Sequence, residues 1–323
     1  MDFLEEVVLH GDDAVGELRI KIRELPMADG VHASTGCQLW CSSIVLAQDV
    51  LTRPQLVADK TVVEIGAGCG LLGIAVARLA RRTLLTDGDE EAVRNLQFNL
   101  EVNEPVWRCS AAGEEVRNRE ASTRVLRWGE VNGWPADERV QVVIGSDIIY
   151  GHWGDKVAEA CLHMVAPGGI IMLAAAEDRR SGVRVFQEHL YAAGWHVSET
   201  KFCSERGNFR FYECRERQPG DSLEPGPVVT RVEQASRSAS TNINTTPSLS
   251  PKASLTDPVT PKECWRVVAS AIVRDGLNAE LSGMLGRLWK GALVHEIERT
   301  DSRLHYTKLE GQGPDTGWVS FVS

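Results

Sequence analysis

The sequence predicts an α/β fold with a doubly wound, mostly parallel sheet, followed by a small C-terminal β-barrel. Apolar runs alternate with helical patterns between about residues 30 and 215, a Pro-rich segment follows, and short apolar runs recur in 262–323. Strands that alternate with helices form the crossover units of a parallel sheet, whereas closely spaced short strands form barrels or sandwiches. At roughly 150 residues per domain, 323 residues accommodate both domains.

The first half of the α/β segment contains two strands and two helices. Residues 61–65 form a short apolar run that predicts a buried strand, and residues 71–81 have helical spacing. A second apolar run at 83–86 predicts the next strand. The helix that follows, at 90–102, is expected to place four residues on one face, namely Val93, Leu96, Gln97 and Leu100.

The second half continues the alternation. A buried strand is expected at 140–145, a helix at 156–165 that stops before Pro167, and another strand at 170–174. Residues 195–198 and 209–213 predict a terminal pair of strands. The short connections imply right-handed crossovers and hence a mostly parallel sheet.

Composition changes sharply at one segment, residues 218–261. This segment holds seven of the thirteen prolines, has no aromatic residue and is rich in Ser and Thr. Such a segment cannot bury enough apolar surface to offset its ordering entropy, so we expect a disordered linker. The expected organisation is an N-terminal extension at 1–30, the α/β domain at 31–217, the linker at 218–261 and the small barrel at 262–323.

Charge and cysteine usage exclude several classes of protein. The net charge of −10 opposes binding to nucleic acid. The acidic N-terminus does not resemble a signal peptide, and the longest apolar stretch, 170–176, is far shorter than the ~20 residues of a membrane span. The eight cysteines show no C-x-x-C pair, so no metal site is expected. We therefore expect a cytoplasmic or nuclear protein with reduced thiols.

A glycine-rich turn after the strand at 61–65 indicates a ligand site. Gly68, Gly70 and Gly73 match the spacing of dinucleotide-binding loops, whereas Glu64 with the glycines at 66, 68 and 70 matches the first motif of S-adenosylmethionine-dependent methyltransferases. An acidic residue such as Asp87, about 20 positions on, binds ribose hydroxyls in either class. A carboxylate before the first glycine would repel a diphosphate but suits the ammonium and sulfonium charges of S-adenosylmethionine.

Four further segments resemble one group of protein-lysine methyltransferases. Residues 84–103 are similar to the "TD … NL … N … N" run of these seven-β-strand enzymes, which modify non-histone proteins such as chaperones, elongation factors and calmodulin. The helix led by Trp40, the L-x-W-G segment ending at Gly129 and the D-x-x-Y motif of Asp147 and Tyr150 follow the same family pattern. The resemblance covers about residues 30–215.

This resemblance implies a Rossmann-like sheet of seven strands and a role for each matched residue. Asp87 is expected to accept hydrogen bonds from the ribose hydroxyls and Trp128 to pack on the adenine. Asp147 and Tyr150 would be the catalytic pair that orients the amine, although Asp147 could instead cap a helix that begins at Ile148. The full set expected to bind the cofactor is Trp40, Glu64, Gly66, Ala67, Gly68, Gly70, Asp87, Trp128 and Ser146.

The expected activity is methyl transfer from S-adenosylmethionine to a lysine of a non-histone protein. Transfer to arginine, an N-terminal amine or a small molecule remains open, as does a non-catalytic scaffold, because fold and cofactor loop do not fix the acceptor. The G-x-G-P … G-W-V ending at 311–319 resembles SH3-like barrels. A peptide or protein ligand of that module is an expected second partner.

Overall fold

The computed structural model describes residues 4–25, 35–109, 115–116, 118–177, 182–204, 206–218, 221, 228–232, 264–266, 271–277, 284–288, 292–300, 303–310 and 313–320. The chain divides into two compact units, residues 1–233 and 234–323. Most of the segment expected to be a linker, 218–261, lies outside the described residues.

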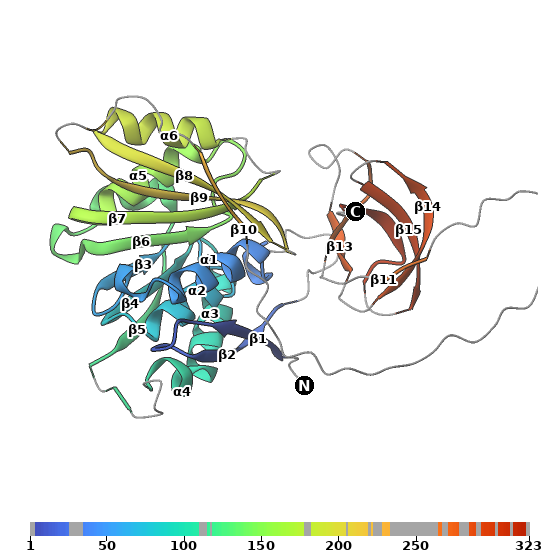
Figure 1. Cartoon of the computed structure of the whole chain (residues 1–323), viewed down its shortest axis with the longest axis horizontal. Helices are drawn as coiled ribbons and strands as arrows, with labels where there is room; N and C mark the ends of the chain where they lie inside the picture. The colour runs from blue at the N-terminus through green and yellow to red at the C-terminus, as the bar shows by residue number, and fades with distance from the viewer. Residues whose placement is uncertain are drawn as a thin grey trace, which may run out of the picture. The chain divides into compact units, whose positions relative to one another are not determined.

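The first unit is built around an eight-stranded sheet in the order β10-β8-β9-β7-β6-β3-β4-β5 (Figure 1). Strand β9 runs antiparallel to both β7 and β8, and the other neighbours are parallel, so the prediction of a mostly parallel sheet is confirmed. The strands are β3 (Thr61–Glu64), β4 (Arg82–Asp87), β5 (Glu120–Val125), β6 (Val140–Ser146), β7 (Val165–Ala176), β8 (Trp195–Ser204), β9 (Gly207–Glu216) and β10 (Val229–Val232).

Helices cover both faces of this sheet, as expected of a doubly wound fold. The sheet interior separates two apolar cores: Val62 and Val142 belong to one, and their neighbours Val63 and Val143 belong to the other. This alternation follows from the two-residue period of a strand. The helices are α1 (Cys41–Leu51), α2 (Leu71–Ala77), α3 (Glu90–Val102) and α4 (Glu104–Trp107) on the side of the first core, and α5 (Gly154–Met164) and α6 (Val183–Ala192) on the other.

Four short 3₁₀ helices complete the described helical structure of this unit. They are η1 (Thr35–Cys37), η2 (Pro54–Leu56), η3 (Trp128–Gly133) and η4 (Ala136–Glu138). Two of them, η1 and η3, lie in segments that line the site described below. In the part of the chain that the structure describes, no helix is both long and apolar enough to span a bilayer.

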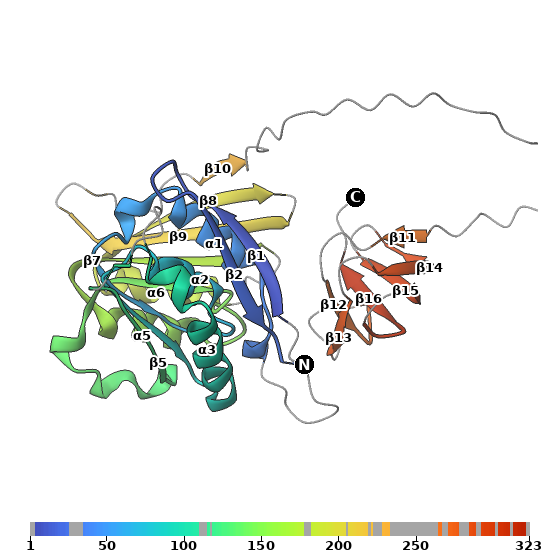
Figure 2. The ribbon, with the colours of Figure 1, turned by 90° about the horizontal axis from the view of Figure 1, so that it is seen from below.

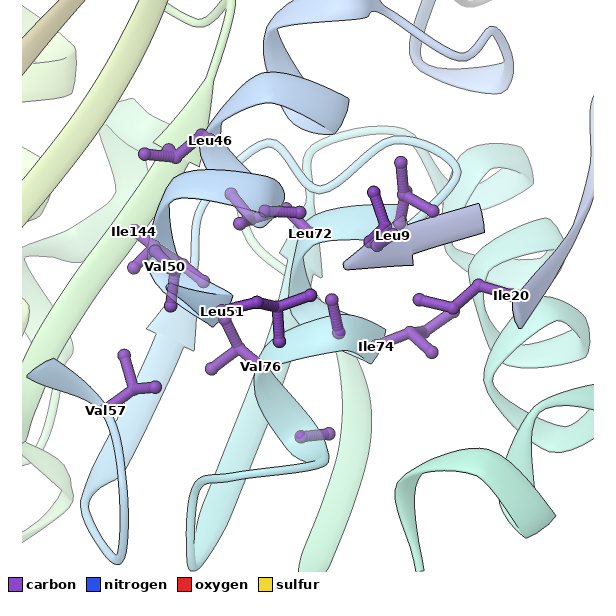
Figure 3. Close-up of a cluster of buried hydrophobic side chains, with 14 of the residues drawn as sticks. Leu9, Ile20, Leu46, Val50, Leu51, Val57, Leu72, Ile74, Val76 and Ile144 are labelled. Atoms are coloured by element: carbon purple, nitrogen blue, oxygen red, sulfur yellow. The ribbon is translucent and has the colours of Figure 1, made fainter. Parts of the chain in front are cut away.

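The N-terminal extension is a structured β-hairpin, which the sequence analysis did not identify. Strands β1 (Leu4–His10) and β2 (Glu17–Arg23) pair in antiparallel register and lie alongside α1, α2 and α3 (Figure 2). Figure 3 shows Leu9 and Ile20 of the hairpin in one cluster with Leu72 and Ile74 of α2. The sequence of β2 alternates polar and apolar residues, and the apolar ones are buried, so this pattern could have predicted the strand.

Asparagines of α3 hold this hairpin. Asn99 and Asn103 each accept from a backbone N–H of β2 and donate to the carbonyl of the same residue, Arg23 and Lys21 respectively, at 2.7–3.1 Å. Asn95 also donates to the Arg23 carbonyl, at 2.9 Å. The side chains repeat every four residues and therefore act like a third strand along β2.

The buried face of α3 thus differs from the expected one. Gln97 is exposed and Val93 is only half-buried, whereas Asn95 and Asn99 are 1% and 0% exposed. A pattern based on hydrophobicity alone misses this face, because its asparagines are buried by their hydrogen bonds to backbone rather than by apolar contacts.

Two edge strands were also not expected. Strand β5, at one edge, carries polar side chains that are mostly exposed, so it lacks the apolar run of the central strands. Strand β10, at the other edge, lies inside the segment expected to be a linker and pairs in parallel with β8. Because of β10, the sheet has eight strands rather than the expected seven.

The second unit is a six-stranded antiparallel sheet in the order β11-β14-β15-β16-β12-β13. A small apolar cluster that includes Tyr306 and Val319 forms its core. The expectation of short strands in this region is confirmed. The strands are β11 (Cys264–Arg266), β12 (Ala271–Arg274), β13 (Met284–Leu288), β14 (Leu293–Arg299), β15 (Arg303–Glu310) and β16 (Thr316–Ser320).

Candidate functional site

A cavity of about 630 Å³ opens at the carboxyl ends of β3, β4 and β6. This is the edge at which open α/β sheets bind ligands. All but one of the residues expected to form the site line it. Those lining residues are Trp40, Gly66, Ala67, Gly68, Gly70, Asp87, Trp128, Ser146, Asp147 and Tyr150.

The glycine turn between β3 and α2 forms the floor of the cavity. Gly66, Gly68 and Gly70 have φ angles of 62°, 55° and 85°, in the left-handed region that favours glycine. A Cβ atom on Gly68 would lie 2.7 Å from the Gly36 carbonyl oxygen, so a side chain has no room there. The turn therefore brings backbone N–H groups close to whatever occupies the cavity.

Asp87, at the end of β4, fixes this turn. Its Oδ2 accepts from the Gly68 N–H at 3.0 Å, and its Oδ1 accepts from the Asp89 N–H at 3.1 Å. Burial raises the pKa of Asp87, and the backbone hydrogen bonds from Asp89 and Gly68 oppose that shift. A carboxylate has about four acceptor sites, so Asp87 can also accept from a hydroxyl group of a ligand.

Glu64 is the residue that the structure does not bring to the cavity. Its side chain is 0% exposed and lies beneath the turn against Gly73, and it is not among the lining residues. Burial raises the pKa of Glu64 well above its usual value, and the nearby charge of Asp87 adds to the shift. The expected contact with the ammonium and sulfonium groups of a ligand therefore does not follow from this geometry, and Glu64 supports the turn from below.

Asp147 follows β6 and has a positive φ of 53°. Its Oδ1 accepts from the Ala176 N–H at 2.9 Å, and its Oδ2 accepts from the Ser42 hydroxyl at 2.5 Å. No helix begins at Ile148, since α5 starts at Gly154, so the alternative in which Asp147 caps a helix is wrong. The carboxylate instead joins the ends of two strands to α1.

Aromatic side chains form one wall of the cavity. The ring of Trp128 contacts Tyr150 and Trp153 edge-on, with centroids 6.3 and 6.0 Å apart. Tyr150 and Trp153 are 43% and 37% exposed, so part of each ring is accessible to a ligand in the cavity. Desolvation, and then the charge of Asp87, raise the pKa of Tyr150, so its hydroxyl stays protonated near neutral pH.

Trp153 and His152 also lie near this wall. Trp153 lines the cavity. His152, whose place two residues after Tyr150 favours a rim or loop histidine over a proton acceptor, is exposed, stacks on Trp153 at 4.9 Å and does not line the cavity.

The segment before α1 covers the glycine turn and was missed by the sequence analysis apart from Trp40. Gly36, Gln38, Leu39 and Ser43 line the cavity beside that tryptophan. The segment is tied to the end of the hairpin, because the Gln38 side chain donates to the Leu25 carbonyl at 2.7 Å. The four additional lining residues are of common types with no characteristic spacing, so only the tertiary structure identifies them as part of the site.

The cavity lining is acidic. Four carboxylates line it, those of Asp87, Asp89, Glu130 and Asp147, against one guanidinium, that of Arg127. Arg127 also lies 3.5 Å from Glu90 and 3.9 Å from Glu130, which offsets its charge. The site therefore favours cationic ligands and opposes phosphates. Within the described ranges, no group of three or more His, Cys, Asp or Glu residues could hold a metal ion.

Comparison with known proteins places this cavity in a family context. The family model described as "Lysine methyltransferase" matches residues 20–192, which include every lining residue. Protein-lysine N-methyltransferase EFM3 of Chaetomium thermophilum is 29% identical over 194 residues, which are 57% of this chain and 54% of that protein. Protein N-terminal and lysine N-methyltransferase EFM7 of Cryptococcus neoformans is 30% identical over 130 residues, which are 38% of this chain and 40% of that protein.

The chain thus spans about half the length, or less, of the curated relatives it matches. Among solved structures, the T. thermophilus 16S rRNA methyltransferase RsmC is 14% identical with a TM-score of 0.45, and the match covers 67% of this chain and 52% of that one. The family match spans more than half of the chain, from within β2 to the end of α6. The chain belongs to the lysine methyltransferase family.

Proposed function

We propose that the protein transfers a methyl group from S-adenosylmethionine to a lysine side chain of a non-histone protein. The observation that carries this proposal is the convergence of the glycine turn, Asp87, Asp147 and Tyr150 on one cavity in a chain of this family. These residues come from three different strand ends, and only the folded sheet brings them together.

The residues of the cavity fit S-adenosylmethionine. A glycine turn without side chains leaves room for the amino-acid part, Asp87 offers lone pairs to the ribose hydroxyls, and Trp128 offers a flat apolar ring to the adenine. The acidic lining suits the two positive charges of this molecule. When bound, it supplies an activated methyl group on a sulfonium centre.

The same lining favours a cationic acceptor over a nucleic acid. A lysine ammonium is attracted by Asp147 and can lie against the exposed rings of Tyr150 and Trp153, whereas a phosphate backbone is repelled. The net charge of −10 acts in the same direction. Protein, rather than RNA or DNA, is therefore the proposed partner.

The chain's own residues position the acceptor. A lysine has a reference pKa near 10.4, so it must lose a proton before its nitrogen can react, and that proton can pass to water. Asp147 accepts a hydrogen bond from the amine and holds it in line, and its charge stabilises the positive charge of the methylated product. Tyr150, which stays protonated, packs beside the acceptor and limits access of water to it.

The test uses binding and turnover separately. Calorimetric titration with S-adenosylhomocysteine, with NAD as the control ligand, should show binding of the first alone and a loss of affinity in Asp87→Ala. Tritiated S-adenosylmethionine, incubated with the protein and a cell extract, should label a protein band at a lysine. Asp147→Ala should lose at least about tenfold in turnover with little change in S-adenosylhomocysteine affinity.

Other outcomes would change the assignment. Mass spectrometry that places the methyl group on an N-terminal amine would favour the N-terminal methyltransferase activity for which the EFM7 relative is named. A label on arginine or in small molecules would contradict the lysine proposal but retain the methyltransferase. Binding of S-adenosylhomocysteine without any labelled acceptor would favour a non-catalytic scaffold.

We also propose that the second unit is an SH3-like barrel that binds a protein or peptide. The antiparallel strand order and the G-x-G-P … G-W-V ending support this proposal.

For the location of the protein we propose the cytoplasm, with the nucleus as a second compartment. The scattered spacing of the cysteines, with no C-x-x-C pair, supports a reducing compartment. Fluorescence microscopy of the tagged full chain tests this location. Fluorescence in the secretory pathway, or in an organelle other than the nucleus, would contradict it.

A further inference from the structure

Ser42 lies in the first turn of α1 and is 0% exposed, and its hydroxyl donates to Asp147 Oδ2 at 2.5 Å. We propose that Ser42 is a positioning residue for methyl transfer, which holds the Asp147 carboxylate in the orientation that the acceptor amine requires. This inference rests on the proposed function of Asp147. Nothing in the sequence pattern distinguished Ser42 from Ser43, its neighbour.

The backbone at Asp147 makes such support necessary. Within the described residues, Asp147 and Asp59 are the non-glycine residues with positive φ. A left-handed conformation is unfavourable for a residue that carries a Cβ atom, although Asp tolerates it better than most. Surrounding contacts must therefore fix the residue in place.

Three hydrogen bonds provide this restraint. The Asp147 N–H donates to the Ala174 carbonyl at 2.8 Å, and the Ala176 N–H donates to Oδ1 at 2.9 Å. Both bonds come from the end of β7 and therefore fix one side of the residue. Ser42 adds a contact from a different element, α1, and together with the Ala176 N–H it fixes the rotation of the carboxylate.

The occupied lone pairs define what remains for the substrate. Each carboxylate oxygen has about two acceptor sites, and Ser42 and Ala176 use one on each oxygen. Asp147 lines the cavity, so its remaining lone pairs are available there to an amine N–H. Without the Ser42 hydroxyl the carboxylate can rotate, and the acceptor amine loses its alignment with the methyl donor.

The location of Ser42 also couples two parts of the site. Trp40, two residues earlier, caps α1 and lines the cavity. The bond from Ser42 therefore holds the wall that carries Trp40 against the strand ends that carry Asp147. Ser42 itself does not line the cavity, and its hydroxyl donates to Asp147, the residue proposed to hold the acceptor, so its loss should affect turnover more than cofactor affinity.

The experiment is a double-mutant cycle on the full chain, with methyl transfer from tritiated S-adenosylmethionine to the protein band labelled by the wild type. Ser42→Ala should lower kcat about tenfold, with S-adenosylhomocysteine affinity within about twofold of the wild type. Asp147→Asn preserves tolerance of the left-handed backbone but removes the charge. In that background Ser42→Ala should have less than a twofold effect, because the group through which it acts is gone.

Thr52→Ala is the matched control. It removes a hydroxyl from the other end of α1, where Thr52 donates to the Asp49 carbonyl at 2.7 Å and is exposed. Its turnover should equal that of the wild type. Unchanged kcat in Ser42→Ala, or independent effects of the two substitutions in the cycle, would overturn the inference while leaving the proposed function intact. A wild type that binds S-adenosylhomocysteine but labels no acceptor would refute both.

Discussion

Asn99→Ala tests whether the N-terminal hairpin supports the glycine turn. The Asn99 amide joins three elements: it accepts from the Arg23 N–H at 2.8 Å and donates to the carbonyls of Arg23 at 3.1 Å and Cys69 at 3.0 Å. Cys69 lies in the glycine turn and lines the cavity. Asn99 therefore links β2, α3 and the ligand site through a single fully buried side chain.

The magnitude follows from the hydrogen bonds that the substitution removes. The Arg23 carbonyl retains Asn95 as a donor at 2.9 Å, whereas the Arg23 N–H and the Cys69 carbonyl lose this partner. Removing one partner of a buried hydrogen bond costs about 1–3 kcal/mol, so the loss of two should lower the free energy of hairpin opening by about 2–6 kcal/mol. The affinity for S-adenosylhomocysteine should also fall, since the turn loses its support.

The opening of the hairpin is measured by hydrogen exchange with mass spectrometry on the peptide that contains β2. The affinity for S-adenosylhomocysteine is measured by calorimetry. Asn103→Ala is the informative comparison, because Asn103 bonds Lys21 of β2 at 2.7–2.9 Å but does not bond the turn. It should speed exchange in β2 with little loss of affinity. Gln97→Ala, on the exposed face of α3, should change neither quantity by much. Equal affinity losses in the Asn99 and Asn103 variants would refute the direct link between Asn99 and the turn.

Three further predictions concern the floor of the cavity. Gly68→Ala should weaken S-adenosylhomocysteine binding more than tenfold, because the new Cβ atom would lie 2.7 Å from the Gly36 carbonyl oxygen in a left-handed backbone. Gly16 is also left-handed but has no neighbouring atom within 4 Å, so Gly16→Ala should leave the affinity measured by calorimetry unchanged. Similar losses of affinity in both variants would contradict this argument. Glu64→Gln should raise the melting temperature at pH 8, and the gain should shrink as the pH falls toward 4.5. The reason is that the pKa of Glu64 is raised in the folded state, so the folded protein loses stability as the pH rises above the pKa of the unfolded chain. A gain in melting temperature that does not depend on pH would contradict this explanation. Burial also raises the pKa of Asp87, so the affinity of the wild type for S-adenosylhomocysteine should fall as the pH is lowered and the carboxylate is protonated. Asp87→Asn should bind this ligand weakly at every pH. If the variant kept the pH dependence of the wild type, the titration would belong to another group.

Local patterns in the sequence were sufficient for the central part of the fold. The apolar runs at 61–65, 83–86, 140–145 and 170–174 correspond to β3, β4, β6 and β7, because a strand buried on both faces must be apolar along its whole length. Edge strands have no such requirement, and β5 and β10 were therefore missed. The asparagine face of α3 was missed for a related reason: the partners that make buried amides favourable, Lys21 and Arg23, are more than 70 residues away in the sequence.

The sequence by itself determined which residue types could form a site: glycines that permit a left-handed turn, and carboxylates at the ends of strands. Most of these residues line one cavity, because parallel strands bring their carboxyl ends to the same edge of a sheet. Only the tertiary structure decided where each side chain points. It buried Glu64 beneath the turn, set Asp147 between β7 and Ser42, and opened Trp153 to the cavity. Side-chain direction depends on contacts between segments far apart in the chain, and local sequence patterns do not encode those contacts.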